Sequence, residues 1–153
     1  MNGGLYKLKI AYIAEVDLNI YHGVVNKILS EVKEWQKLGN EVEIFLKSYN
    51  YNNLKFADYC HIYSGIYKKN STKPNLLKGF LNKYIHFNKI LRDIKKFNPD
   101  IIYFRYNIWY PFLVRNMLSI SRYIVEMNSN DINETKLRGK FRYFYNKVGR
   151  KKI

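Results

Sequence analysis

The strongest constraint on the fold is a strand, helix, strand pattern within residues 8–46. Residues 8–14, LKIAYIA, form the continuous apolar run that a strand covered on both faces requires. Residues 41–46, EVEIFL, alternate apolar and acidic side chains in the period of a strand. Between them, apolar residues recur at helical spacing, namely Val25, Ile28, Leu29, Val32, Trp35 and Leu38. The pair Gly39-Asn40 is expected to end this helix. The pattern predicts two parallel strands joined by a helical crossover.

The rest of the chain continues the alternation of strands and helices. The expected elements are a strand at 57–64, a helix at 76–97, a strand at 101–106, a short helix at 111–117, a strand at 122–127 and a basic segment at 134–152. Such an order predicts an α/β fold, a Rossmann-like open, mostly parallel sheet with helices on both faces. A chain of 153 residues with 47% apolar content suits one domain, 1–153.

Net charge constrains the partners. The chain has 27 Lys and Arg against 12 Asp and Glu, a formal charge of +15, which favours phosphate-bearing partners or an anionic membrane face. Compositional bias is the alternative, because the chain is also rich in Asn, Ile and Tyr. Charge alone does not choose between the two.

Cysteine and histidine usage indicates a reduced setting without a metal. Cys60 is the only cysteine, so we expect a lone buried thiol and a cytoplasmic protein. No apolar run has the length of a membrane-spanning helix, which leaves a soluble protein or one peripheral at the inner face of the membrane. His22, His61 and His86 lack the Cys or carboxylate spacing of zinc ligands, and no metal is expected.

Three stretches lie where the carboxyl ends of parallel strands are expected, the edge at which open α/β sheets bind ligands. Gly23 follows His22 where the first helix begins, and it would let a ligand approach the free backbone N–H groups there. Arg105 and Tyr106 end one strand, and EMNSND at 126–131 ends another. The alternatives are turn chemistry at Gly23, a structural ion pair at Arg105 and Asx turns at 126–131.

Taken in order, four stretches resemble the N-terminal domain of family 4 glycosyltransferases, which have the two-Rossmann GT-B architecture. They are KIAYIAE at 9–15, HGVVNKILSEVKEWQKLGNEVEIF at 22–45, FNPDIIYFRY at 97–106 and RYIVEMNSND at 122–131. The resemblance spans nearly the whole chain and implies one half of a GT-B fold. Such enzymes usually show two adjacent glycines where this chain has His22-Gly23, and many place a histidine near the position of Asn128, so no catalytic residue is assigned.

The resemblance also implies a binding site and a reaction. The matching segments border the cleft between the two domains, where this half receives a glycan or lipid-linked acceptor. The substrate-binding residues so implied are His22, Gly23, Val24, Arg105, Tyr106, Glu126, Asn128 and Asn130. The nucleotide-sugar donor would bind mainly to a C-terminal domain, in the same or a separate chain, so no cofactor is expected in residues 1–153. This chain alone is then expected not to transfer sugar.

Two further hypotheses use the positive charge. The first is a non-catalytic α/β module for nucleic acid or another polyanion, which the spread of basic residues over several helices disfavours. The second is contact with an anionic membrane through residues 136–152, where aromatic residues interleave with basic ones. Its alternative is a solvated helix whose aromatic residues pack on the sheet. The membrane-contact candidates are Lys136, Arg138, Lys140, Arg142, Lys147 and Arg150.

Overall fold

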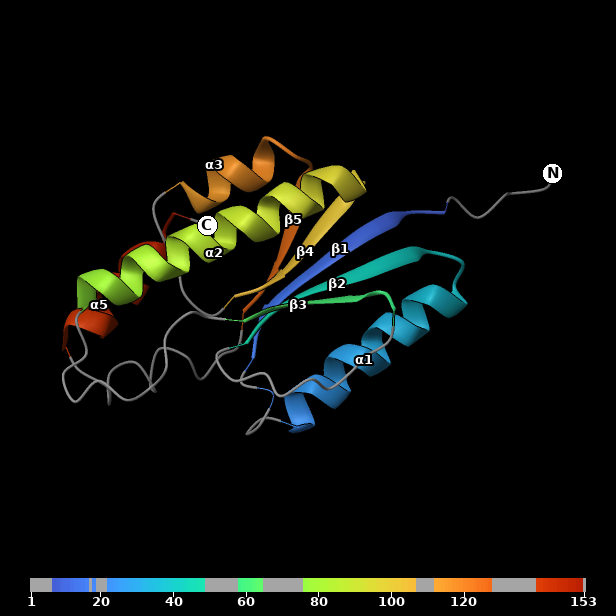
Figure 1. The fold of residues 1–153 in the computed structure, drawn as a ribbon, viewed down its shortest axis with the longest axis horizontal. Helices are drawn as coiled ribbons and strands as arrows, with labels where there is room; N and C mark the ends of the chain where they lie inside the picture. Colours follow the sequence, from blue (N-terminus) through green and yellow to red (C-terminus); the bar gives the residue numbers. More distant parts are fainter. Residues whose placement is uncertain are drawn as a thin grey trace.

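Five parallel strands form the centre of the described part of the molecule. The structure is a computed structural model that describes residues 7–16, 18, 22–48, 58–64, 76–106, 112–127 and 140–152. The strands lie in the order β3-β2-β1-β4-β5, and every neighbouring pair is parallel (Figure 1). This confirms the predicted Rossmann-like open α/β sheet. The strands are β1 (Lys9–Glu15), β2 (Glu41–Ser48), β3 (Cys60–Ser64), β4 (Ile101–Arg105) and β5 (Arg122–Glu126).

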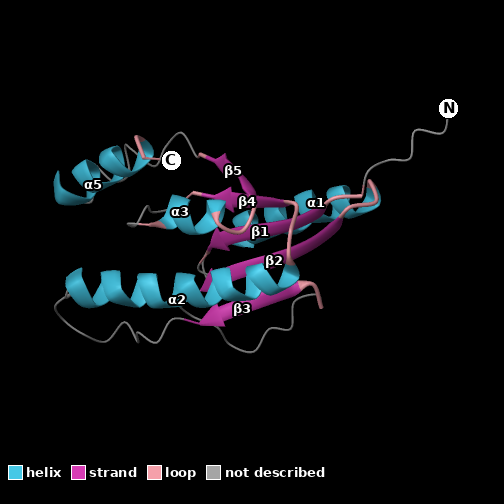
Figure 2. Ribbon diagram, turned by 90° about the horizontal axis from the view of Figure 1, so that it is seen from above, coloured by secondary structure: helices cyan, strands magenta, loops and turns pink. Residues whose placement is uncertain are grey.

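Helices cover both faces of this sheet. The described helices are α1 (His22–Lys37), α2 (Leu76–Phe97), α3 (Leu113–Leu118) and α5 (Lys140–Arg150). Helix α1 packs on one face, and α2 and α3 pack on the other (Figures 1 and 2). In Figure 2 the arrowheads of all the strands point to the same side, so their carboxyl ends share one edge.

Strand β1 supplies side chains to both cores. Tyr12 and Ala14 pack with α1 in one cluster, whereas Ala11 and Ile13 pack with α2 and α3 in the other. All four are at most 1% exposed. A strand with both faces buried reads as a continuous apolar run, which explains the pattern at residues 8–14.

The joint between α1 and β2 ends the helix where the sequence predicts. Gly39 has a φ of 88°, a left-handed conformation that glycine adopts without strain, and its N–H donates to the carbonyl of Gln36 at 2.9 Å. The N–H of Asn40 donates to the carbonyl of Trp35 at 3.2 Å, which completes a Schellman cap. The Asn40 side chain accepts from the N–H of Leu8 at 3.1 Å, so the cap also anchors the chain beside β1.

The turn from α2 to β4 is also tied to β1. Asn98 ends the helix in a left-handed conformation, with a φ of 53°, before Pro99. The Asp100 carboxylate then accepts from the N–H of Lys9 at 2.7 Å, and the Asp100 N–H donates to the Lys9 carbonyl at 2.8 Å. These bonds fix the start of β4 beside the start of β1.

Most differences from the predicted elements are shifts of boundaries. Helix α2 has the predicted bounds, but β1 is shifted by one residue, β3 begins three residues later, and α3 covers 113–118 in place of 111–117. The strand predicted at 122–127 ends at Glu126, and helix α5 covers 140–150 of the basic segment 134–152, of which 134–139 lie outside the described residues. No helix among the described residues is long and apolar enough to cross a membrane.

Two packing expectations were wrong. Leu38 was expected on the buried stripe, but it follows the end of α1 and is 65% exposed. The alternation predicted for residues 41–46 of β2 breaks at Phe45, which is buried like Ile44 and Leu46, and Lys47 and Ser48, beyond the predicted range, are buried as well. The physical reason is the position of β2 between β1 and β3, with helices on both faces.

We expect the burial of α1 to provide much of its stability. Ile28 is fully buried, so Ile28→Ala should lower the free energy of unfolding by about 2 to 5 kcal/mol. Leu29→Ala should cost less, because Leu29 is half-buried. Urea unfolding measures both, with Leu38→Ala as the exposed control, expected within about 0.5 kcal/mol of the parent. Equal losses for Ile28→Ala and Leu38→Ala would contradict this packing.

Candidate functional site at the carboxyl edge of the sheet

An ion pair joins the ends of β4 and β5. Arg105 and Glu126 are register partners on neighbouring strands, and Arg105 Nη1 donates to Glu126 Oε1 at 3.1 Å and to Oε2 at 3.3 Å. Their side chains are 12% and 15% exposed. Arg105 was expected to reach the rim with its guanidinium facing a ligand. The structure places it in the ion pair that was the alternative.

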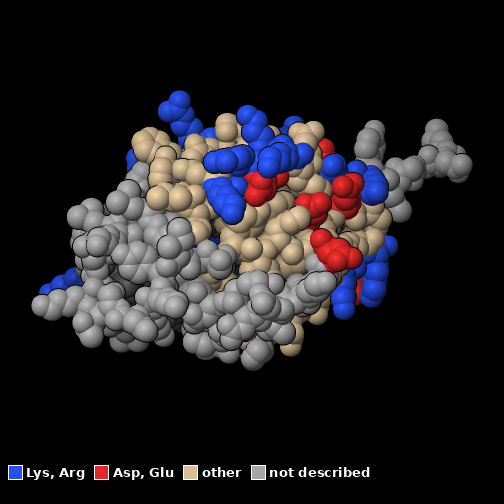
Figure 3. Space-filling view, in the orientation of Figure 1, with Lys and Arg blue, Asp and Glu red and all other residues tan. Residues whose placement is uncertain are grey.

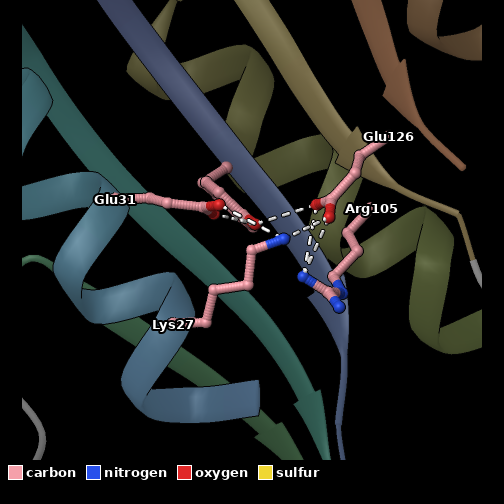
Figure 4. A network of polar contacts seen from close by, with 5 residues as sticks. Lys27, Glu31, Arg105 and Glu126 are labelled. Atoms are coloured by element: carbon pink, nitrogen blue, oxygen red, sulfur yellow. Dashed lines mark hydrogen bonds and ion pairs between the residues drawn. The ribbon is translucent and has the colours of Figure 1, made fainter. Parts of the chain in front are cut away.

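Residues from α1 and β1 extend this pair into a network (Figure 4). Lys27 Nζ lies 2.7 Å from Glu126 Oε1 and 3.3 Å from Glu31 Oε1. The Tyr12 hydroxyl lies 3.0 Å from Glu31 Oε2 and 3.4 Å from Glu126 Oε2. Since a hydroxyl has one proton, the shorter contact identifies Glu31 as its acceptor. We call these five residues the carboxyl-edge network: Tyr12, Lys27, Glu31, Arg105 and Glu126.

The network shifts the pKa values of Tyr12 and Lys27. Burial raises the pKa of the Tyr12 hydroxyl, and the negative charges of Glu31 and Glu126 raise it further, so Tyr12 stays a neutral donor. The hydrogen bond to Glu126 is the main cause that raises the pKa of Lys27, so its ammonium stays charged. Two carboxylates therefore face two cations, and Lys27, at 49% exposed, is the member most open to solvent.

The N-terminus of α1 adjoins this network. Gly23 lies four residues before Lys27, so the two share one face of the helix. Gly23 is exposed, and a Cβ built there would meet nothing within 4 Å. Val24 is half-buried against the core on the α1 side. His22 begins α1, and its side chain lies outside the described part of the structure.

The side chain of Tyr106 lies apart from the contacts described for this network. The Tyr106 side chain is 1% exposed and meets Phe104 edge to face in the core on the α2 side. Its backbone N–H donates to the Glu126 carbonyl of β5 at 3.0 Å. Because the Tyr106 side chain is buried, it does not offer the exposed contact that the expected role in substrate binding requires. Asn128 and Asn130 lie outside the described residues.

Sequence reasoning missed Tyr12, Lys27 and Glu31. A usable signal was present for two of them, because Gly23, Lys27 and Glu31 recur at intervals of four and so line one face of α1. Tyr12 carried no such signal, because it lies inside an apolar strand. Its hydroxyl matters only because α1 places Glu31 above it.

A second polar cluster lies on the α2 side of the same edge. Lys47 Nζ, at the end of β2, is 3.7 Å from Glu15 Oε1 at the end of β1, and the two side chains are 1% and 8% exposed. His86 of α2 is buried nearby, and its Nε2 has no hydrogen-bond partner within the described part of the chain. Burial lowers the pKa of His86, and the positive charges of Lys47 and Lys89 lower it further. His86 is therefore neutral in the folded protein near neutral pH.

Other expected residues occupy separate positions. Cys60 is half-buried, and burial raises the pKa of its thiol to about 12, so it stays protonated. No group of three or more His, Cys, Asp or Glu residues that could hold a metal is found in the described ranges. Of the membrane-contact candidates, Lys140 and Lys147 are exposed and Arg150 is half-buried. The side chain of Arg142 and all of Lys136 and Arg138 fall outside the description.

Comparisons with known proteins leave the geometry as the main guide. The chain matches no protein-family model, and it matches no curated protein.

Removal of Arg105 should destabilise the fold. Arg105→Ala leaves the Glu126 carboxylate largely buried, which should lower the free energy of unfolding by about 2 to 3 kcal/mol, below the value for a fully buried pair. Lys37→Ala breaks an exposed pair with Glu34 and should cost at most about 0.5 kcal/mol. Urea unfolding compares the two. The Arg105→Ala, Glu126→Ala double variant should lose less than the sum of its single variants, and strict additivity would contradict the coupling.

His86 should make stability depend on pH. The unfolded chain takes up a proton at His86 as the pH falls through about 6.5, whereas the folded protein, with its lowered pKa, does not. The free energy of unfolding should therefore fall as the pH drops below that value. Above it, the contribution of neutral His86 to stability should be complete. We expect the free energy of unfolding to drop less between neutral and mildly acidic pH in His86→Leu and His86→Met than in the parent. Urea unfolding at the two pH values measures this drop. Identical pH profiles would show that His86 is not the cause.

Proposed function

We propose that this domain is the acceptor-binding half of a glycosyltransferase that moves a sugar from a nucleotide-sugar donor to a glycan or lipid-linked acceptor. One observation carries the proposal: the N-terminus of α1 and the carboxyl-edge network lie at the carboxyl ends of the neighbouring strands β1 and β4. In this sheet of order β3-β2-β1-β4-β5, the helices α1 and α3 that follow β1 and β4 pack on opposite faces, and open α/β sheets bind ligands beside such a point. The resemblance of the sequence to family 4 enzymes supports the same assignment.

The chemistry of this edge suits an acceptor with hydroxyls and phosphate. Gly23 leaves room for a close approach to the first turn of α1, whose free N–H groups favour anions. Lys27 is half exposed one turn further on and carries a positive charge. The carboxylates of Glu31 and Glu126 accept hydrogen bonds, as sugar hydroxyls require, although their present partners occupy much of that capacity.

The donor belongs to another part of the enzyme in this proposal. Transfer requires donor and acceptor to be held at reacting distance, and that positioning supplies a large part of catalysis. The acceptor half places one of the two substrates. A donor domain, in the same or a separate chain, would bind the nucleotide and its diphosphate.

A binding module for nucleic acid is the second candidate. The charge of +15 favours it, since phosphate contacts supply most non-specific affinity. On the face seen in Figure 3, however, Lys and Arg side chains are scattered and do not form one continuous patch, and acidic side chains lie among them on one side. Gel-shift titration tests this candidate, because phosphate contacts require affinity to fall steeply with salt.

The proposal predicts that bulk at residue 23 blocks the acceptor without unfolding the domain. We expect the purified protein to bind neutral or phosphate-linked glycans on an array, and Gly23→Val to bind them at least about tenfold more weakly. A Cβ at this position meets open space, so the variant should keep its stability. Ser30→Val is the matched control, because Ser30 is exposed and lies seven residues, about two turns, further along α1. Equal glycan binding by both variants, or no binding by the parent, would overturn the assignment.

A further inference from the structure

Helix α5 presents a stripe of cations around one aromatic residue. Lys140, Phe144 and Lys147 are spaced by four and three residues, which places them on one face of α5, and Lys151 follows directly after the helix. All four are exposed, and the Phe144 side chain is 66% exposed. Gly149, on the other side, is buried. An aromatic ring that faces outward among lysines gains nothing from the core of this domain.

Helix α3 also turns apolar side chains outward. Leu113 and Met117 are buried in the core on the α2 side, whereas Phe112 and Leu118 are each 59% exposed, with the exposed Arg115 between them. Phe112 has a φ of 69°, a conformation that bulky residues rarely adopt. The fold therefore holds a large aromatic side chain at the surface against its backbone preference.

The two helices meet at a shallow hollow. Its volume is about 410 Å³, and Phe112, Val114, Arg115 and Leu118 line it together with Lys152, just after α5. Figures 1 and 2 agree in placing the end of α5 near α3. We call the exposed residues of this region the α3/α5 surface: Phe112, Arg115, Leu118, Lys140, Phe144, Lys147, Lys151 and Lys152.

The two segments that form this surface carry charge of one sign. Residues 112–121 and 140–152 contain no Asp or Glu, and their basic residues are Arg115, Lys140, Arg142, Lys147, Arg150, Lys151 and Lys152. Exposed apolar side chains within a cationic surface are the combination that binds the interface of an anionic bilayer. Nucleic acid would use the cations, but an aliphatic side chain such as Leu118 gains little beside phosphates.

We propose that the α3/α5 surface docks on a membrane that contains anionic phospholipids. Phe112, Leu118 and Phe144 enter the headgroup region, and the lysines contact the lipid phosphates. This inference goes beyond the proposed function, because none of these residues belongs to the carboxyl-edge network. It also revises the predicted contact: the structure adds α3, whereas Arg150 is half-buried and lies off the exposed stripe of α5.

Vesicle co-sedimentation tests the proposal with the intact protein. Vesicles of phosphatidylcholine alone are compared with vesicles that also contain phosphatidylglycerol, at low and moderate salt. The parent should sediment only with the anionic vesicles, and less so at higher salt. Each of Lys147→Gln and Lys151→Gln should weaken binding about fivefold, and Phe144→Ser about tenfold.

Matched controls lie on α1 and just after its end, away from this surface. Lys33→Gln removes an exposed lysine and Leu38→Ser removes a 65% exposed leucine, and both variants should bind vesicles like the parent. Circular dichroism verifies that each variant is folded. Gly23→Val should also bind vesicles normally, so failure of the membrane proposal and failure of the acceptor proposal can be told apart.

Several outcomes would overturn the membrane proposal. One is equal recovery of the parent with neutral and anionic vesicles, including no recovery with either. Another is a loss of binding in the α1 controls as large as in the variants of the α3/α5 surface. A third is tight, salt-sensitive binding of single-stranded RNA that Lys147→Gln weakens and Phe144→Ser leaves unchanged, without vesicle binding, which would assign the cations to nucleic acid.

Discussion

The pairing of β1 with β2 and β4 holds the described fold together. β1 lies in the middle of the sheet, and its alternate side chains enter the two cores that α1 and α2 cover. A strand buried on both faces tolerates few polar groups, because each must find a hydrogen-bond partner away from water. The Tyr12 hydroxyl is such a group, and Glu31 of α1 satisfies it. The position of α1 over the sheet thus depends on a polar contact as well as on apolar packing.

The carboxyl-edge network links stability to the candidate site. Glu126 accepts hydrogen bonds from Arg105 and Lys27, so one carboxylate connects β4, β5 and α1. Substitution of Arg105 or Glu126 therefore changes the fold together with any ligand contact. Gly23 is different, because it lies on α1 with open space beside it. Position 23 is where binding can be tested with the least effect on stability.

Local patterns predicted much of the fold. The bounds of α2, the cap at Gly39 and the order of strands and helices along the chain were predicted correctly, since each depends on periodicity or on the conformational freedom of a few neighbouring residues. Local patterns gave no signal for the burial of Lys47, a charged residue that is 1% exposed beside Glu15. They also gave no signal that Tyr106, just after β4, turns its ring into the core.

The sequence by itself determined that the chain alternates parallel strands with helices, that β1 is buried on both faces, and that polar residues end β4 and β5. Only the tertiary structure decided which of those polar residues meet. Arg105 and Lys27 are 21 and 99 residues from Glu126 along the chain, and they reach it because β4 lies between β1 and β5 with α1 packed on that face. Side-chain periodicity is local to each element, whereas the neighbours of a strand are set by the packing of all the elements together.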